Sequence, residues 1–347
     1  MAPSRCILAL IAVLAAAGSL ATPAAAGDAA PVYKIVKEVP LGMPDKWDFV
    51  YFDAGRVYVS HGTEVTVIDG RSGELIGRVP GIDGSHGVVA APSLGRGYAD
   101  ATNANSLVAF DLKTLKPLAT MPAGEDADDV VYDPATKRVF VMDADGTAMT
   151  AVDAVQNKTI STTPLNGKPE SATVDGAGNL FINSASTNEV LRVDTRSLAI
   201  LSRWPVPDCQ SPHGLAIDTA AHRLFVSCVN AKLQVVSSDD GHVVATLPIG
   251  KGTDTAAFDP KRKLIFSSNG EGTLSVIAER GADDFVSLGE VPTAPGARTM
   301  AVDPASGRVF LVTGEVAKTE PPTVKGRAPH FVFVPGSVKL LLLDPQT

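Results

Sequence analysis

Residues 133–153 read DPATKRVFVMDADGTAMTAVD, and this stretch contains the features that decide the fold. It begins with Asp-Pro, a pair that favours a type I turn because proline fixes φ at the second position. A short run rich in β-branched residues follows around Phe140, and a second run ends at Asp153. The stretch therefore predicts two short strands that follow a tight turn and are joined to each other by a second turn.

The same pattern recurs seven times along the chain. An aromatic residue stands in the first run at spacings of 40, 42, 41, 44, 41 and 44 residues: Tyr58, Tyr98, Phe140, Phe181, Phe225, Phe266 and Phe310. An aspartate closes the second run in five of the repeats: Asp69, Asp111, Asp153, Asp194 and Asp344. Self-similarity at a period of about 42 residues is typical of propellers and other repeat architectures.

Each repeat contains four short strands, because a further run follows the closing aspartate, as in ELIGRV at residues 74–79. Only six such fourth strands follow the seven units, but residues 32–39 (VYKIVKEV) have the same pattern. We expect residues 32–39 to pair with residues 338–343, which closes the ring and removes its open edge. The sequence thus predicts an all-β, seven-bladed β-propeller with four-stranded blades, closed by the N-terminal strand.

The repeats resemble the YVTN type, and the chain resembles the YncE-like family of exported seven-bladed propellers over residues 32–347. The best-matching stretches are SPHGLAIDTAAHRLFVSCVN (residues 211–230), GTDTAAFDPKRKLIFSSNGEGTLSVI (252–277) and GARTMAVDPASGRVFLV (296–312). The resemblance implies the fold, whereas propellers as a class host binding modules, lyases, lactonases and metal oxidoreductases.

The first 26 residues have the pattern of a signal peptide. Arg5 supplies a positive charge, residues 7–20 form an apolar run too short to span a membrane, and Ala24-Ala25-Ala26 fits a cleavage site. We therefore expect residues 27–347 to form one mature domain of 347 − 26 = 321 residues, monomeric, periplasmic or secreted, and without a membrane span.

The charge of the chain argues against nucleic acid as a partner. Lys and Arg number 30 against 38 Asp and Glu, which gives −8, and loss of Arg5 makes the mature chain −9. A protein this acidic lacks the basic surface that a phosphate backbone requires. Parts of the resembled family suggest nucleic-acid binding, and this charge disfavours it here.

Two cysteines, Cys209 and Cys228, remain in the mature chain. In an oxidising compartment a lone pair most simply forms a disulfide. Two buried thiols and a metal or redox pair are the alternatives.

In a propeller, the residue that enters the innermost strand of each blade lies at the mouth of the central funnel, where ligand sites gather. Counting back five residues from each turn position gives seven ionisable residues, which we call the mouth ring: Asp48, His86, Asp128, Glu170, His213, Asp254 and Arg298. About a quarter of residues are ionisable on average, so composition alone does not explain seven of seven.

The mouth ring has three possible roles. It could be a solvated structural ring, it could bind an organic or peptide ligand with Arg298 as a clamp for a carboxylate or phosphate, or it could bind a divalent metal ion. The metal ligands would be His86, Asp128, Glu170, His213 and Asp254, because imidazole and carboxylate groups suit divalent cations. With neutral histidines the ring carries −4 + 1 = −3, which favours a cation at the mouth.

A binding or scaffold function is favoured over catalysis, because the sequence contains no GxSxG, HExxH or P-loop motif. The alternative is a metal-dependent hydrolase, similar to a lactonase, with its site at the funnel mouth. The partner would be a small molecule or a protein.

One insertion breaks the repeat between Thr313 and Val338. Residues 314–337 number 24 where other blades have a few, and they also fall on the funnel side. Long loops in compact domains often serve as lids or binding loops. We expect this insertion either to cover the ring, with His330, Phe331 and Phe333 packed over it, or to be a flap without function.

Overall fold

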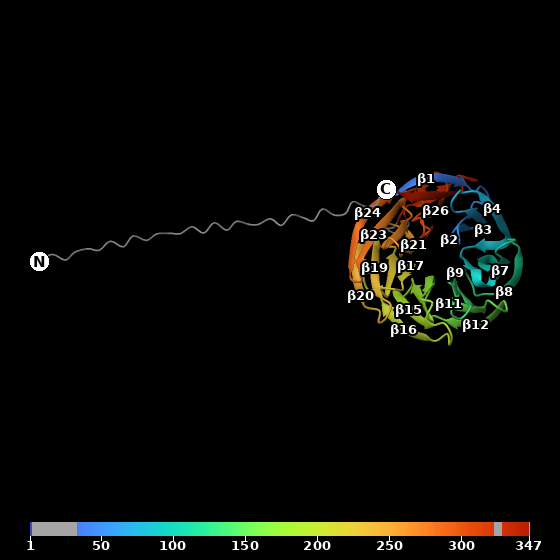
Figure 1. Ribbon diagram of the computed structural model, residues 1–347, viewed down its shortest axis with the longest axis horizontal. Coiled ribbons are helices and arrows are strands. Elements are labelled where there is room, and N and C mark those ends of the chain that lie inside the picture. Colours follow the sequence, from blue (N-terminus) through green and yellow to red (C-terminus); the bar gives the residue numbers. More distant parts are fainter. Residues whose placement is uncertain (2–32, 323–327, 347) are drawn as a thin grey trace.

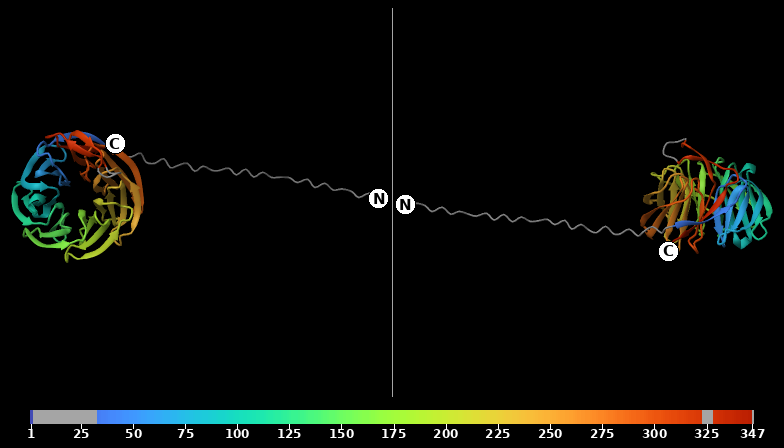
Figure 2. Two further views of the ribbon diagram at one scale, coloured as in Figure 1. Left: turned by 180° about the vertical axis from the view of Figure 1, so that it is seen from behind. Right: turned by 90° about the horizontal axis from the view of Figure 1, so that it is seen from above.

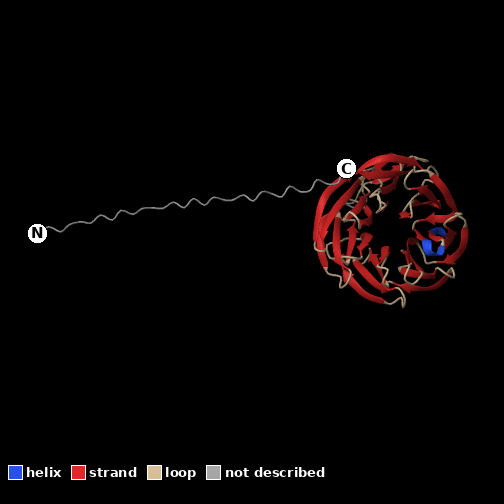
Figure 3. Ribbon diagram, in the orientation of Figure 1, coloured by secondary structure: helices blue, strands red, loops and turns tan. Residues whose placement is uncertain are grey.

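A computed structural model describes Met1, residues 33–322 and residues 328–346, so residues 2–26 of the predicted signal peptide lie outside the described residues. Seven small sheets stand around a central axis, as Figure 1 shows. Figure 3 shows that strands dominate, with two short 3₁₀ helices, η1 (Pro92–Leu94) and η2 (Thr102–Ala104). The predicted seven-bladed propeller is confirmed.

The two inner positions of each blade follow the predicted repeat. The innermost strands are β2 (Val50–Asp53), β5 (Val88–Ala91), β9 (Ala127–Asp133), β13 (Pro169–Val174), β17 (Pro212–Asp218), β21 (Thr253–Asp259) and β25 (Met300–Val302). The second strands are β3 (Arg56–Asp69), β6 (Arg96–Ala101), β10 (Arg138–Asp143), β14 (Asn179–Ser184), β18 (Arg223–Cys228), β22 (Leu264–Asn269) and β26 (Val309–Thr313).

The two outer positions complete the blades. The third strands are β7 (Ser106–Asp111), β11 (Ala148–Asp153), β15 (Glu189–Asp194), β19 (Lys232–Ser237), β23 (Thr273–Gly281) and β29 (Lys339–Pro345). The outermost strands are β4 (Leu75–Ser85), β8 (Pro117–Pro122), β12 (Lys158–Pro164), β16 (Ile200–Pro205), β20 (Val243–Pro248), β24 (Asp284–Pro292) and β1 (Tyr33–Pro40). In the first blade, β3 pairs with β2 through its first four residues and with β4 through later ones, so it supplies both middle strands.

Ring closure follows the prediction. β1 pairs antiparallel with β29, from Tyr33 opposite Pro345 to Pro40 opposite Lys339, and β29 pairs on its other side with β26. The closing blade therefore combines strands from near both ends of the chain. β1 takes the outermost position in this blade, as β4 does in the first. Closure of this kind leaves no radial gap for another chain to pair with.

The recurring aromatic residues form the core between blades. All seven are exposed by 2% or less. Five of them pack against other aromatic rings; Tyr33 of the closing strand meets Phe266 edge-on at 5.5 Å, and Phe52 stacks on Phe310 at 5.5 Å. Each buried ring removes on the order of 150–250 Å² from water, which explains why the aromatic position is the clearest part of the repeat.

Arginine residues join neighbouring blades at the end of the ring opposite the mouth. In five blades an arginine that begins the second strand, or in the last blade directly precedes it, donates to backbone carbonyls beyond the third strand of the next blade. The pairs are Arg56 with Leu112, Arg96 with Ala154, Arg138 with Thr195, Arg223 with Ala282 and Arg308 with Gly70. These carbonyls lie at turns and lack strand partners, so each arginine satisfies them and ties two blades together.

Cys209 and Cys228 form a disulfide, as expected. Cys209 precedes β17 and Cys228 ends β18, so the bond ties the loop that leads into the fifth blade to that blade's second strand. In the described part of the chain, no helix has the length and apolar character needed to cross a membrane.

Candidate functional site

All seven residues of the mouth ring lie where the repeat predicts. Asp128, Glu170, His213 and Asp254 are the second residues of β9, β13, β17 and β21, and the other three lie two residues before β2, β5 and β25. The strands all begin at the same end of the axis, because every blade repeats the same direction. The ring therefore surrounds the mouth of the propeller.

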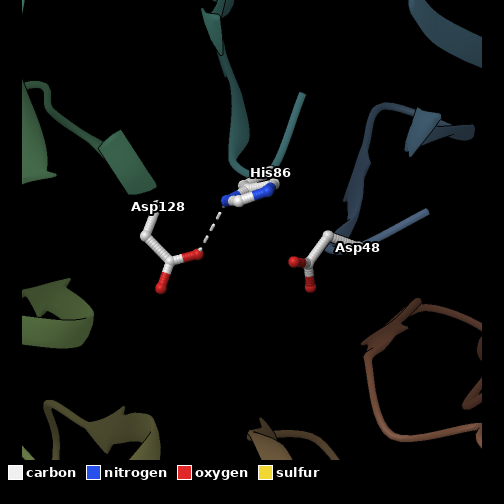
Figure 4. Close-up of side chains that lie close together, drawn as sticks. All are labelled: Asp48, His86 and Asp128. Carbon is white, nitrogen blue, oxygen red and sulfur yellow. Dashed lines mark ion pairs between the residues drawn. The ribbon is translucent and has the colours of Figure 1, made fainter. Parts of the chain in front are cut away.

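Three of these residues converge. Asp48, His86 and Asp128 each offer one ligand atom, and these atoms lie within 4.8 Å of one another. The closest approach is 3.3 Å, between His86 Nδ1 and Asp128 Oδ1. Figure 4 shows the three side chains reaching from successive blades toward a shared space at the mouth. We call this group the Asp48–His86–Asp128 cluster.

The other members make different contacts. Arg298 Nε lies 3.0 Å from Asp254 Oδ2 in an ion pair across two blades. The Nδ1 atom of His213 lies 3.0 Å from the carbonyl of Ser211, in its own loop. The group suited to a metal ion thus adds Asp48 to His86 and Asp128, and it leaves out Glu170, His213 and Asp254 from the expected set.

Burial changes the charge that the ring carries. It raises the pKa of Asp48 to about 8 and that of Glu170 to about 8, and the neighbouring carboxylates of Asp128 and Asp254 add to both shifts. The adjacent Asp128 carboxylate raises the pKa of His86 to about 9. At pH 7, Asp48 and Glu170 are therefore largely protonated, while His86 is charged.

The sequence count of −3 consequently overstates the negative charge. The two remaining carboxylates, of Asp128 and Asp254, lie beside the cations of His86 and Arg298. At neutral pH the mouth ring is close to electrically neutral, because buried carboxylates that repel one another keep their protons.

The backbone beneath the cluster is fixed by a residue that the sequence analysis missed. Asp100 is fully buried on β6, and its carboxylate accepts hydrogen bonds from the backbone N–H groups of His86 and Gly87, each at 2.7 Å. The Thr299 hydroxyl likewise donates to the carbonyl of Asp48 at 2.7 Å. An aspartate inside the apolar run GYADA was the available signal, since such a residue needs buried donors.

A cavity of about 1000 Å³ opens beside the ring at the same end. Two mouth-ring residues, His86 and Arg298, line this cavity. The mouth-ring acids Asp48, Asp128, Glu170 and Asp254 do not line it. Residues outside the mouth ring also contribute, among them Trp47, His330, Phe331 and Phe333. The cavity lining therefore combines cationic groups with aromatic rings, and it also contains the acidic residues Asp45 and Asp83.

The insertion supplies the aromatic side. Its described residues contain a two-stranded hairpin of β27 (Val316–Glu320) and β28 (His330–Phe333), which we call the insertion hairpin. The edge-on view in Figure 2 shows its red ribbon at one face of the disc. Residues 323–327 of the insertion lie outside the described residues.

The insertion hairpin is held against the ring by packing. Phe333 meets Trp47 edge-on at 4.7 Å, and its ring lies directly on Gly296, where a Cβ atom would clash with it. The backbone N–H of Gly336 donates to the carboxylate of Asp45. Phe331 and Phe333 thus line the cavity beside the mouth, and Phe333 packs on Trp47.

Comparison with known proteins supports the fold. The WD40 repeats of RRP9 match with a TM-score of 0.74 and 9% identity, over 90% of this chain and 99% of that one. Kuenenia stuttgartiensis hydrazine synthase matches with a TM-score of 0.66 and 13% identity, over 82% of this chain and 94% of that one. No family model matches, and neither does any curated protein. At these identities the likeness shows the propeller fold alone.

Proposed function

We propose that this protein is an exported binding protein, similar to YncE-like propellers, that takes a small organic anion in the cavity at its mouth. The ligand would carry a carboxylate or phosphate at one end and an aromatic or apolar group at the other. The observation that carries this proposal is the composition of the cavity lining, which combines His86 and Arg298 with the aromatic rings of Trp47, Phe331 and Phe333.

The charge at the wall favours an anion. Arg298 is paired with Asp254 through Nε at 3.0 Å, and its side chain is 56% exposed, so it remains accessible to a ligand. A guanidinium suits carboxylate and phosphate because its N–H groups form a planar fork. His86, with a pKa raised to about 9 by Asp128, adds a second positive group at pH 7.

The aromatic residues of the lining favour an apolar or aromatic group. Trp47, Phe331 and Phe333 line the cavity, and aromatic rings stack readily on planar ligands. A volume of about 1000 Å³ lies at the upper end of the range for small-molecule sites. Export would follow from the predicted signal peptide at residues 1–26.

Binding of simple probes tests this proposal. Benzoate and phenyl phosphate should raise the melting temperature of the protein and give saturable heats in calorimetric titration, whereas neutral benzamide should do neither. Arg298→Met should remove the response to both anions. Arg138→Met is the matched control, because Arg138 binds backbone carbonyls at the opposite end of the ring. An equal response to benzamide, or an undiminished response in Arg298→Met, would refute anion binding at this wall.

Deletion of the insertion hairpin tests the aromatic wall. Glu315 and Val334 are joined by a backbone hydrogen bond of 2.7 Å, so removal of residues 316–333 can be closed without distorting the blade. We expect the variant to keep its β-sheet circular dichroism and to bind benzoate more weakly. Unchanged affinity would exclude a role for the hairpin in binding.

A metal-dependent hydrolase remains the second candidate, because the Asp48–His86–Asp128 cluster lies at the edge of the same cavity. A divalent ion there would polarise a ligand carbonyl or activate water. Metal-dependent turnover of lactone or ester substrates, lost in Asp48→Asn, would favour the hydrolase over the binding protein.

A further inference from the structure

The three donor atoms of the Asp48–His86–Asp128 cluster already have spacings close to those around a metal ion. Two ligands bound at about 2.1 Å to one ion lie roughly 3.0–3.4 Å apart in octahedral or tetrahedral geometry. His86 Nδ1 and Asp128 Oδ1 lie 3.3 Å apart, and all three donors fall within 4.8 Å. Small rotations of the Asp48 and Asp128 side chains would bring all three donor atoms to bonding distance from one ion.

These donors also lack ordinary partners. The Nδ1 atom of His86 is shielded from solvent, and its approach to Asp128 lacks the alignment of a hydrogen bond. Among the described residues, no hydrogen bond from a backbone or side-chain donor reaches the carboxylate oxygens of Asp48 or Asp128. Asp100, by contrast, accepts hydrogen bonds from two backbone donors.

The backbone that carries the cluster is fixed before any ion arrives. His86 is held through its N–H by Asp100, and Asp48 is held through its carbonyl by Thr299 and through its N–H by the carbonyl of Ser60 at 3.0 Å. Ligands on a fixed backbone lose little entropy when an ion binds, which favours affinity.

We propose that Asp48, His86 and Asp128 form a binding site for one divalent transition-metal ion, such as Zn²⁺, Mn²⁺ or Co²⁺. The imidazole nitrogen favours these ions over Mg²⁺ and Ca²⁺, which prefer all-oxygen sites. Three protein ligands leave further positions open, and those positions lie beside the cavity and Arg298. The site would therefore add a second anchor for an anionic ligand.

The inference holds for either proposed function, because it concerns the ion alone and is tested without any organic ligand.

Titration of the chelator-stripped full chain with Zn²⁺, in the absence of any organic ligand, tests the site. We expect one ion per chain and a rise in melting temperature when the ion is bound. His86→Ala and Asp48→Asn should each weaken Zn²⁺ binding more than the 10- to 100-fold typical for loss of an outer-shell partner. Co²⁺ should give visible absorption bands in the wild type that both variants lose.

His213→Ala is the matched control, because His213 occupies the equivalent position of the fifth blade but contacts the Ser211 carbonyl. Its affinity for Zn²⁺ should equal that of the wild type. Circular dichroism of each variant establishes folding, and Asp128→Asn provides a third variant should His86→Ala not fold. Equal Zn²⁺ affinity in His86→Ala and the wild type, loss of binding in His213→Ala, or tighter binding of Mg²⁺ than of Zn²⁺ would overturn the proposal.

Discussion

Replacement of Asp143 by asparagine should stabilise the protein relative to the wild type, and this difference in the free energy of unfolding should grow as pH rises. Asp143 ends β10 and is fully buried, and its carboxylate accepts from the Gly124 N–H at 2.8 Å and the Thr150 hydroxyl at 2.7 Å. An amide can keep both contacts, since Thr150 also hydrogen-bonds to Thr162 and can reverse its role. Only the charge is lost.

The magnitude follows from the pKa of this carboxyl. Burial raises it from 3.8 to about 6, so the folded state holds the proton more tightly than the unfolded state does. The wild type therefore loses stability as pH rises through this interval, whereas the amide does not. Between pH 4.5 and 7.5 the difference amounts to about 2 kcal/mol, or about 3 °C in melting temperature for a ring of this length.

Calorimetric melting of both proteins at pH 4.5, 6 and 7.5 would measure this difference. Asp111→Asn is the control, because Asp111 lies at a turn and the backbone N–H of Thr114 lowers its pKa from the usual 3.8. Its stabilising effect is present above the unfolded pKa and is lost only as pH falls below it, so Asp111→Asn should weaken the protein by nearly the same amount at pH 4.5, 6 and 7.5. A Tm difference for Asp143→Asn that stays constant or falls with pH would refute the reasoning.

Two further predictions concern stability. Replacement of Cys209 and Cys228 by serine should lower the free energy of unfolding by about 3 kcal/mol, because the disulfide closes a loop with a separation of 19 residues. Calorimetry should show a melting temperature about 5 °C lower, and an unchanged Tm would contradict this prediction. Phe225→Ala should lower the free energy of unfolding by about 3–5 kcal/mol, because its ring is fully buried. Leu201 is 51% exposed, so Leu201→Ala should change that free energy by less than about 0.5 kcal/mol; chemical denaturation measures both. Equal effects of the two substitutions would contradict the assignment of the core.

The positions of the mouth ring could be predicted by counting because a repeat ties residue number to place. Once the turn position before the second strand is identified in each repeat, the mouth-ring residue lies five residues before it. Asp128 and Asp254 accordingly occupy the same point of β9 and β21, although neither has a motif of its own. Closure by β1 followed in the same way, from a count of fourth strands.

The pairings within the ring could not be predicted in this way. Counting places His86 and His213 at equivalent points, yet one meets Asp128 and the other its own loop carbonyl. The difference depends on side-chain rotamers and on the local loop, which in the fifth blade is tied by Cys209. Spacing in sequence contains neither kind of information.

Charge was a further quantity that a sequence count could not give. Formal charges assume solvated groups, whereas the site contains Asp48 and Glu170 with pKa values raised to about 8. Burial keeps these carboxylates protonated, and a cation bound nearby would favour their ionised form. Their protonation state therefore depends on whether a cation is bound. An anionic ligand in the cavity and a divalent ion in the Asp48–His86–Asp128 cluster would then strengthen each other's binding, because the ion attracts the ligand that Arg298 clamps. A lower Kd for benzoate in the presence of Zn²⁺, matched by an equal drop in the Kd for Zn²⁺ with benzoate present, would be the thermodynamic sign of that coupling.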